Sequence, residues 1–173
     1  MYVPTGKSPI GKIFKASALD RIEMLKNATN KHDVLDVDDF ECRSNSVSYT
    51  IDTINYFSKS YPDANLRLLI GEDNFNSFIK WHRYEDILNM VNIIILSRDK
   101  MTKYDNMKHI INLKEENISL FNETKSKKIH FSMKKKSNLS STMIRSMINS
   151  NQPIDEYVPH ENIKYIKDRG LYR

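Results

Sequence analysis

A run of hydroxyl residues followed by an arginine, Ser140-Ser141-Thr142-Met143-Ile144-Arg145, is the stretch of this sequence best suited to hold phosphate. We predict that a helix begins there, because serine and threonine favour helix N-termini. Such a terminus carries unpaired N–H groups and a partial positive charge, which together attract an anion. Arg145 lies three residues after Thr142, on the same helix face, so its guanidinium points back toward that spot. Ordinary capping with a solvated arginine is the alternative at this stage.

A second candidate contact follows a predicted strand at Leu66–Ile70. Gly71 permits a tight exit from the strand and a close approach by a ligand. The carboxylate of Asp73, two positions later, can accept hydrogen bonds from ribose hydroxyls. Turn glycines followed by acids are also common in ordinary loops, so this pattern alone leaves both interpretations open.

The only tryptophan, Trp81, stands in the charged segment Lys80–Tyr84. Its indole could stack on a flat heteroaromatic ring, while Arg83 or the backbone N–H of His82 could hold an anionic substituent. A tryptophan in the core or in a lid is the alternative.

Two further polar segments have simple structural explanations. Val47–Thr53 predicts a helix start capped by Ser48, and this pattern requires no function of Thr50. The basic run Lys134–Lys136 is typical of a solvated loop, although it could also attract a polyphosphate bound at Ser140. The five histidines have no ligand spacing with one another or with the single cysteine, so we predict no metal site on the protein.

The overall composition predicts one domain of 173 residues with an ordinary core, since 39% of the residues are hydrophobic. No apolar run approaches the roughly 20 residues that a membrane helix needs, so we expect no membrane partner. Cys42 is alone and the first residues contain no apolar core, which favours a cytoplasmic protein without a signal peptide. The net charge of +5 suits anionic ligands but does not distinguish nucleotides from nucleic acids.

Short apolar runs alternate with amphipathic segments along the chain. The predicted strands are Leu66–Ile70, Asn92–Leu96 and Ile129–Met133, with weaker ones at Tyr2–Pro4 and Val34–Cys42. The first predicted helix is capped by Ser17 and carries Leu19, Ile22, Leu25 and Ala28, and the second runs from Ser48 to before Pro62. Three more helices are predicted at Tyr84–Met90, from Ser140-Ser141-Thr142 onward, and at Glu161–Arg169, where Gly170 ends the helix.

This alternation predicts an α/β fold with an open parallel sheet, in which ligands bind beyond the carboxyl ends of the strands. The loop at Gly71–Asp73, the loop after Leu96 and the helix start at Ser140 should then lie along one rim. The polar segment Thr102–Lys128 is predicted to be a surface excursion.

In this order, the motifs resemble those of bacterial nicotinate-nucleotide adenylyltransferases, and the resemblance covers essentially the whole chain. The matching segments are Val3-Pro4-Thr5-Gly6-Lys7 with Pro9, Asp20–Leu25, Ser48–Ile54, Leu69–Asp73, Trp81-His82, Ser140-Ser141-Thr142 with Ile144-Arg145, and Val158-Pro159 leading to Tyr165-Ile166 and Gly170-Leu171-Tyr172. The resemblance implies a Rossmann-like nucleotidyltransferase domain over residues 1–173 with C-terminal helices.

The implied reaction is transfer of AMP from ATP to nicotinate mononucleotide, which gives deamido-NAD and pyrophosphate. By the resemblance, Trp81, the His82 backbone and Thr50 hold the nicotinate group, while Asp73 in the Gly71 loop meets ribose. The residues that embrace the ATP phosphates are Ser140, Ser141, Thr142 and Arg145. Magnesium is expected on the leaving pyrophosphate.

One departure concerns the start of the family's pattern. The family opens with a strand, a Gly-Gly-[Ser/Thr]-Phe-x-Pro loop and a His-x-Gly-His segment that stabilises the transferring phosphate. No glycine of this chain is followed by histidine: the residues after Gly6, Gly11, Gly71 and Gly170 are Lys7, Lys12, Glu72 and Leu171. Lys12 or Lys15 stands where the family usually shows a Pro-His-Lys segment, and Lys12 is a further candidate phosphate contact.

We therefore expect the family's first strand and helix to be missing, through either a misassigned gene start or decay of the gene. The catalytic residues then stay unassigned. A parallel sheet without its central strand would expose unpaired edges. We expect negligible AMP transfer by these 173 residues alone.

Two alternatives remain at this stage. Another adenylyltransferase of the same superfamily, such as the pantetheine-phosphate enzyme, would not be expected to have Ser48-Tyr49-Thr50 or Trp81. A non-catalytic nucleotide or nucleic-acid binder using Lys134–Lys136 would bind polynucleotides with steep salt dependence. The sequence favours nicotinate mononucleotide and ATP as ligands over nucleic acid.

Overall fold

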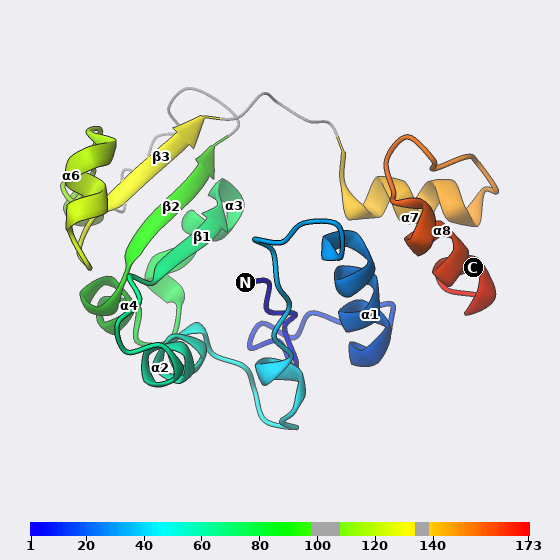
Figure 1. Ribbon diagram of the computed structural model, residues 1–173, viewed down its shortest axis with the longest axis horizontal. Coiled ribbons are helices and arrows are strands. Elements are labelled where there is room, and N and C mark those ends of the chain that lie inside the picture. The colour runs from blue at the N-terminus through cyan, green and yellow to red at the C-terminus, as the bar shows by residue number, and fades with distance from the viewer. Residues whose placement is uncertain (98–107, 134–138) are drawn as a thin grey trace. The chain divides into compact units, whose positions relative to one another are not determined.

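The computed structural model describes residues 1–97, 108–133 and 139–173 (Figure 1). The chain forms two compact units. The terminal unit combines Met1–Ser48 with Asn138–Arg173, and the central unit is Tyr49–Ser137. The expectation of one nucleotidyltransferase domain over residues 1–173 stays a prediction, and each unit is described by itself below.

The central unit contains a three-stranded sheet in the order β1-β2-β3 (Figure 1). Its strands are parallel, as the sequence predicted. The strands are β1 (Arg67–Gly71), β2 (Asn92–Ser97) and β3 (Ile129–Met133). The helices of this unit are α2 (Thr50–Ser60), α3 (Glu72–Phe75), α4 (Tyr84–Met90), α5 (Lys108–Ile111) and α6 (Ile118–Glu123), with a 3-10 helix at Phe78–Lys80. The predicted α/β class is therefore confirmed.

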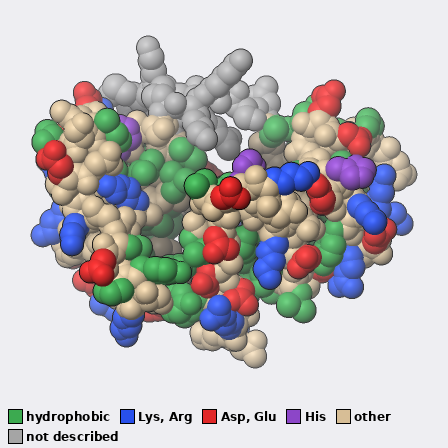
Figure 2. Space-filling model, in the orientation of Figure 1, with side chains coloured by type: hydrophobic (Ala, Val, Ile, Leu, Met, Phe, Trp, Pro, Cys, Tyr) green, Lys and Arg blue, Asp and Glu red, His purple; other side chains and the backbone are tan. Residues whose placement is uncertain are grey.

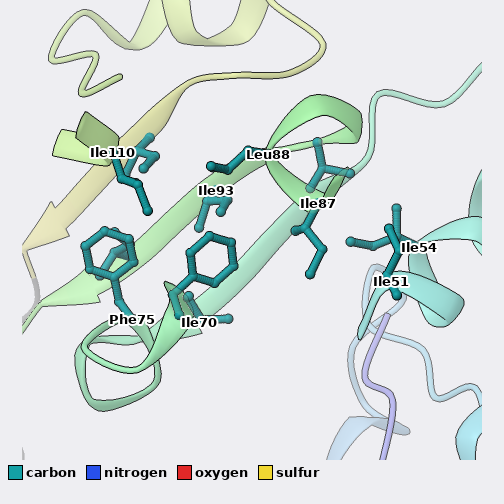
Figure 3. Close-up of a cluster of buried hydrophobic side chains, with 12 residues drawn as sticks. Ile51, Ile54, Ile70, Phe75, Ile87, Leu88, Ile93 and Ile110 are labelled. Carbon is teal, nitrogen blue, oxygen red and sulfur yellow. The ribbon is translucent and has the colours of Figure 1, made fainter. Parts of the chain in front are cut away.

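The core of the central unit lies where helices cover the middle strand. Ile93 and Ile95 of β2 are fully buried, because β2 pairs with a neighbour on each side. Figure 3 shows Phe75 and Ile70 beside Ile93, with Ile87 of α4 near the same cluster. Close packing of these apolar side chains fixes the carboxyl end of β1, from which the Gly71 loop departs.

A buried amide anchors the segment before β3. Asn92 Nδ2 donates to the carbonyl oxygens of Phe121 at 3.0 Å and of Thr124 at 2.7 Å. Its Oδ1 accepts from the N–H of Lys128 at 3.0 Å. Most of the described residues in the predicted surface excursion are exposed, but Ile110 and Phe121 are fully buried on short helices and fix the segment to the core. Isolated apolar residues in polar surroundings carry no periodic signal.

The terminal unit is built from helices α1 (Ala18–Thr29), α7 (Ser141–Asn149) and α8 (His160–Asp168). Ser17 caps α1 as predicted, but Leu19 is 76% exposed and lies off the packed face. The predicted strand Val34–Cys42 is wrong. This segment instead forms one parallel bridge, between Val37 and Tyr2, and a 3-10 helix at Phe40–Cys42. It does not form a strand because its acidic residues leave no apolar face to bury.

A buried carboxylate joins α1 to α8. Asp20 Oδ1 accepts from the Tyr165 hydroxyl at 2.9 Å and from Arg169 Nε at 3.1 Å. Its Oδ2 accepts from the Ser17 hydroxyl at 2.6 Å. These contacts, the hydrogen bond to Ser17 foremost, lower the pKa of Asp20. No helix in the described ranges combines the length and the apolar character needed to span a membrane.

Candidate functional site

The start of α7 has the geometry that its hydroxyl residues predict. Ser140 is the N-cap, and its Oγ accepts from the N–H of Met143 at 3.1 Å. Within the described ranges, the N–H groups of Ser141 and Thr142 have no hydrogen-bond acceptor. The helix thus presents two free donors at its positive end, where an anion is stabilised.

Arg145 lies on the same side of α7 as the hydroxyl residues. Its Nη2 donates to Thr142 Oγ1 at 3.2 Å, so the guanidinium is held one turn from the helix start. A cavity of about 400 Å³ opens beside these residues. It is lined by Met24, Leu139, Ser140, Ser141, Ile144, Arg145, Ile148, Tyr157, Val158, Asn162, Ile166 and Tyr172. We call this cavity the α7 pocket.

Lys12 is separate from the α7 pocket in this structure. Its side chain is exposed and its Nζ lies 5.8 Å from the centroid of the Phe14 ring. The guanidinium carbon of Arg21 lies 4.0 Å from the same ring. Since Lys12 does not line the pocket, its predicted phosphate contact stays a prediction.

In the central unit, Gly71 allows a carboxylate to lie close to the backbone. A Cβ at Gly71 would lie only 2.7 Å from Asp73 Oδ1. Asp73 itself is exposed in the first turn of α3. The carboxylate is therefore available at the carboxyl end of β1, where the sequence placed it.

A tight turn follows the 3-10 helix and contains Trp81 and His82. The N–H of Tyr84 donates to the carbonyl of Trp81 at 3.3 Å, and Arg83 adopts a left-handed conformation with φ 55° and ψ 42°. A non-glycine residue in this region is uncommon and tends to mark a functional site. Within the described chain, the N–H groups of His82 and Arg83 have no acceptor.

The ring contacts around this turn bring Thr50 and His82 into one neighbourhood. The rings of Tyr49 and His82 lie 4.4 Å apart, and Tyr49 is the N-cap of α2, directly before Thr50. Ser48, the predicted cap of this helix, donates instead to the carbonyl of Glu41 at 3.4 Å. The N-terminus of α2 is therefore left without a side-chain cap.

Trp81 is half-buried rather than sealed in the core. Its indole packs against Phe78, with 5.4 Å between ring centroids, and one part of it remains accessible. The Arg83 guanidinium donates to Asp86 Oδ2 at 2.6 Å. Because this pair occupies the Arg83 side chain, the free backbone N–H groups are the better candidates to hold an anion.

The predicted site residues thus form two sets. Thr50, Gly71, Asp73, Trp81 and His82 belong to the central unit, while Ser140, Ser141, Thr142, Arg145 and Lys12 belong to the terminal unit. The basic run Lys134–Lys136 and the loop after β2 lie outside the described residues. On the face drawn in Figure 2, lysine and arginine side chains are interspersed with acidic ones on each unit.

Sequence reasoning assigned no site role to Tyr49, Asn162 or Tyr172, although Tyr49 and Tyr172 stand in segments that resemble the family, and it considered the side chain of Arg83 rather than its backbone. The ring of Tyr49 and the turn at Arg83 support the His82 neighbourhood, and the other two residues line the α7 pocket. No local sequence pattern singles out Asn162. Asn162 contacts the backbone of Met24, 138 positions away.

Comparison with known proteins gives a consistent result. Residues 7–147 match the model of the cytidylyltransferase-like family. A probable nicotinate-nucleotide adenylyltransferase of Caldicellulosiruptor bescii is 31% identical over 174 residues, covering 100% of this chain and 83% of that protein.

Two solved structures of the Plasmodium falciparum nicotinic acid mononucleotide adenylyltransferase, each 17% identical, share the fold. The complex with NaAD gives a TM-score of 0.68 and covers 98% of this chain and 80% of that one. The complex with APC gives 0.63 and covers 91% and 76%.

Proposed function

Because this chain belongs to the cytidylyltransferase-like family, and within it to the nicotinate-nucleotide adenylyltransferases, we propose that it serves NAD biosynthesis by transferring AMP from ATP to nicotinate mononucleotide. The products are deamido-NAD and pyrophosphate. The observation that supports this proposal is a set of backbone N–H groups without acceptors among the described residues, at the Trp81–Tyr84 turn and at the start of α7.

The turn in the central unit suits the nicotinate group. Its two free N–H groups, at His82 and Arg83, can donate to the two oxygens of a carboxylate, while a carboxamide offers only one acceptor oxygen. The accessible part of the Trp81 indole can cover the pyridine ring. Asp73 can accept hydrogen bonds from ribose hydroxyls, and Thr50 lies at the uncapped start of α2.

The start of α7 suits a triphosphate. The free N–H groups of Ser141 and Thr142 and the cation of Arg145 neutralise phosphate charge in one place. We propose that Mg²⁺ enters together with ATP, bound by phosphate oxygens of the substrate. A cytoplasmic location is proposed from the lone, unpaired cysteine.

The reaction is a direct displacement at phosphorus. A 5′-phosphate oxygen of nicotinate mononucleotide forms a bond to the α-phosphorus of ATP, and the bond from that phosphorus to the α,β-bridging oxygen breaks. Pyrophosphate leaves with its electron pair, and no covalent enzyme intermediate is needed. The residues described here act by positioning and by charge neutralisation.

These 173 residues contain no His-x-Gly-His segment. Binding is the first test of this proposal, because it reports on each proposed contact directly. Trp81 is the only tryptophan, and its fluorescence therefore reports directly on the proposed nicotinate site.

The decisive variant is His82→Pro, compared with His82→Ala. Proline removes the His82 N–H, and the preceding Trp81 already has the extended conformation that proline favours, with φ −73° and ψ 145°. Alanine removes the ring but keeps the N–H. We expect His82→Pro to weaken nicotinate mononucleotide binding by about tenfold or more, the effect of losing a hydrogen bond to a charged group.

His82→Ala should weaken binding much less, and nicotinamide mononucleotide should bind more weakly than the acid form. The comparison requires that both variants unfold at the same temperature as the unmodified chain, so that a loss of binding does not reflect a loss of folding. Equal losses in the two variants would show that the ring, and not the backbone, holds the ligand. Absence of any fluorescence response to nicotinate mononucleotide would contradict the proposed function.

A further inference from the structure

The terminal unit contains a second cavity, of about 340 Å³, beside the carboxyl ends of α7 and α8. This volume lies in the range of small-molecule sites, roughly 300–1,000 Å³. We call it the α7–α8 cavity. It differs from the α7 pocket, although Ile148 and Ile166 line both. None of the residues proposed above to contact ATP or nicotinate mononucleotide lines the α7–α8 cavity.

The backbone shapes this cavity, because α7 and α8 end in the same way. After α7, the N–H of Gln152 donates to the carbonyl of Met147 at 2.8 Å, and after α8 the N–H of Leu171 donates to the carbonyl of Ile166 at 3.0 Å. The residue before each donor has a left-handed φ, of 52° and 60° respectively. This combination is the Schellman motif, which turns the chain back onto its own helix. Gln152 and Leu171 are thereby held at the cavity wall without any ligand.

The apolar part of the lining is aliphatic. Ile154, Ile163 and Ile166 are each only 6% exposed, and Ile148 and Leu171 are half-buried. No aromatic residue is among the described residues that line the cavity. The lining therefore suits a branched or linear aliphatic group, which is removed from water when it packs there, and it offers no ring on which a flat heterocycle could stack.

Charged side chains of both signs line the same cavity. Lys167 and Arg173 supply cations, and Asp155 supplies a carboxylate. Among the described residues, none of these three side chains belongs to an ion pair. The opposite charges thus share one cavity without neutralising each other. A ligand that carries both an ammonium and a carboxylate can meet both signs, whereas a ligand with one charge leaves one wall unmatched.

We propose that the α7–α8 cavity binds a free aliphatic α-amino acid. The amino acid's side chain packs on the isoleucines, its carboxylate accepts from Lys167 and Arg173, and its ammonium donates to Asp155. No covalent bond forms or breaks. The inference goes beyond the proposed AMP transfer and does not rest on it, because the two use different residues.

The test uses three probes that share an aliphatic chain: norleucine, hexanoate and pentylamine. Hexanoate is norleucine without its ammonium group, and pentylamine is norleucine without its carboxylate. Each is titrated into the full 173-residue chain and followed by NMR of labelled isoleucine methyl groups, which also locates the site. Norleucine should bind about threefold or more tightly than either of the other probes, the effect of one charged contact at a partly exposed site.

Exposed charged residues provide the variants, so that folding is not disturbed. Lys167→Gln and Asp155→Asn should each weaken norleucine binding about threefold, and Asp155→Asn should not weaken hexanoate binding. Lys164→Gln and Asp168→Asn are the matched controls, because both residues are exposed on α8 and neither lines the cavity. The controls should bind norleucine as the unmodified chain does.

Three results would overturn the amino-acid site. These are the absence of shifts in the isoleucine methyl groups with norleucine, equal binding of norleucine and hexanoate, and cavity variants that behave like their controls. No nucleotide is present in these titrations. Failure here therefore leaves the proposed function standing, and failure of nicotinate mononucleotide to bind leaves this site standing.

Discussion

The central and terminal units hold their candidate sites in different ways. In the central unit, Ile93 and Phe75 are fully buried in an apolar cluster, and the loops that carry the candidate site residues leave from the ends of its strands and helices. In the terminal unit, no described apolar side chain reaches that degree of burial, and polar contacts through Asp20 and Asn162 join segments distant in the sequence. Apolar packing thus positions the Trp81–Tyr84 turn, and hydrogen bonds help to position the α7 pocket.

This difference predicts different sensitivities. A unit held by non-directional apolar packing should lose stability in proportion to the apolar volume removed. A unit held by directional hydrogen bonds and close backbone contacts should lose much of its stability when a single atom is misplaced. Substitutions in each unit, with a matched control, test whether the two units differ in this way.

The largest effect is expected at Gly6 in the terminal unit. A Cβ there would lie 1.9 Å from the backbone oxygen of Glu41, which is not a flexible side-chain end. Gly6→Ala should therefore destabilise this unit by more than about 4 kcal/mol. Hydrogen exchange of peptides from Met1–Ser48 measures the effect. Gly11→Asn is the control, because a Cβ at Gly11 meets nothing and asparagine tolerates its φ of 69°. Equal exchange in both variants would contradict the close approach.

An intermediate effect is expected at Ile93 in the central unit. This side chain is fully buried in the middle strand, so Ile93→Ala should reduce the free energy of unfolding by about 3 kcal/mol. Urea unfolding followed through Trp81 fluorescence gives the value. Leu69→Ala in the adjacent strand is the control, since Leu69 is 56% exposed and should cost much less. A similar loss at the two positions would mean that the apolar cluster does not dominate this unit.

The smallest effect is expected at Asp20, and it depends on pH. Its pKa is lowered below 3.8 in the folded protein, so its contribution to stability is present above that value and is lost as the pH falls through the folded pKa. Asp20→Asn should lower the melting temperature by several degrees at neutral pH and flatten the acid dependence below about pH 4. Circular dichroism melts across the acid range measure this. An unchanged acid slope in the variant would show that another carboxylate is responsible.

Periodicity predicted the local elements well. Alternation of apolar runs located all three strands of the sheet, and hydroxyl residues located the starts of α1 and α7. These signals are local, because a strand or a helix places its apolar residues at a fixed spacing. The resemblance to a known family identified the candidate site residues and the reaction.

Tertiary contacts could not be predicted in the same way. Asp20 and Arg169 are 149 positions apart, and no local pattern connects them. The short helix α3 was missed because a four-residue helix shows too little of its period. The strand expected at Val34–Cys42 failed because β-propensity depends on packing against neighbours, which one sequence does not reveal.

The buried amide of Asn92 also fixes the alignment of the sheet. Lys128, whose N–H it binds, directly precedes β3, in which Ile129 pairs with Ile93. A slip of one residue would turn Ile129 and Phe131 to the opposite face of the sheet. A slip of two residues would keep these side chains on the same face, whereas the Asn92 amide, with its fixed donors and acceptor, allows only one alignment. Asn92 thereby sets the register of β3 against β2.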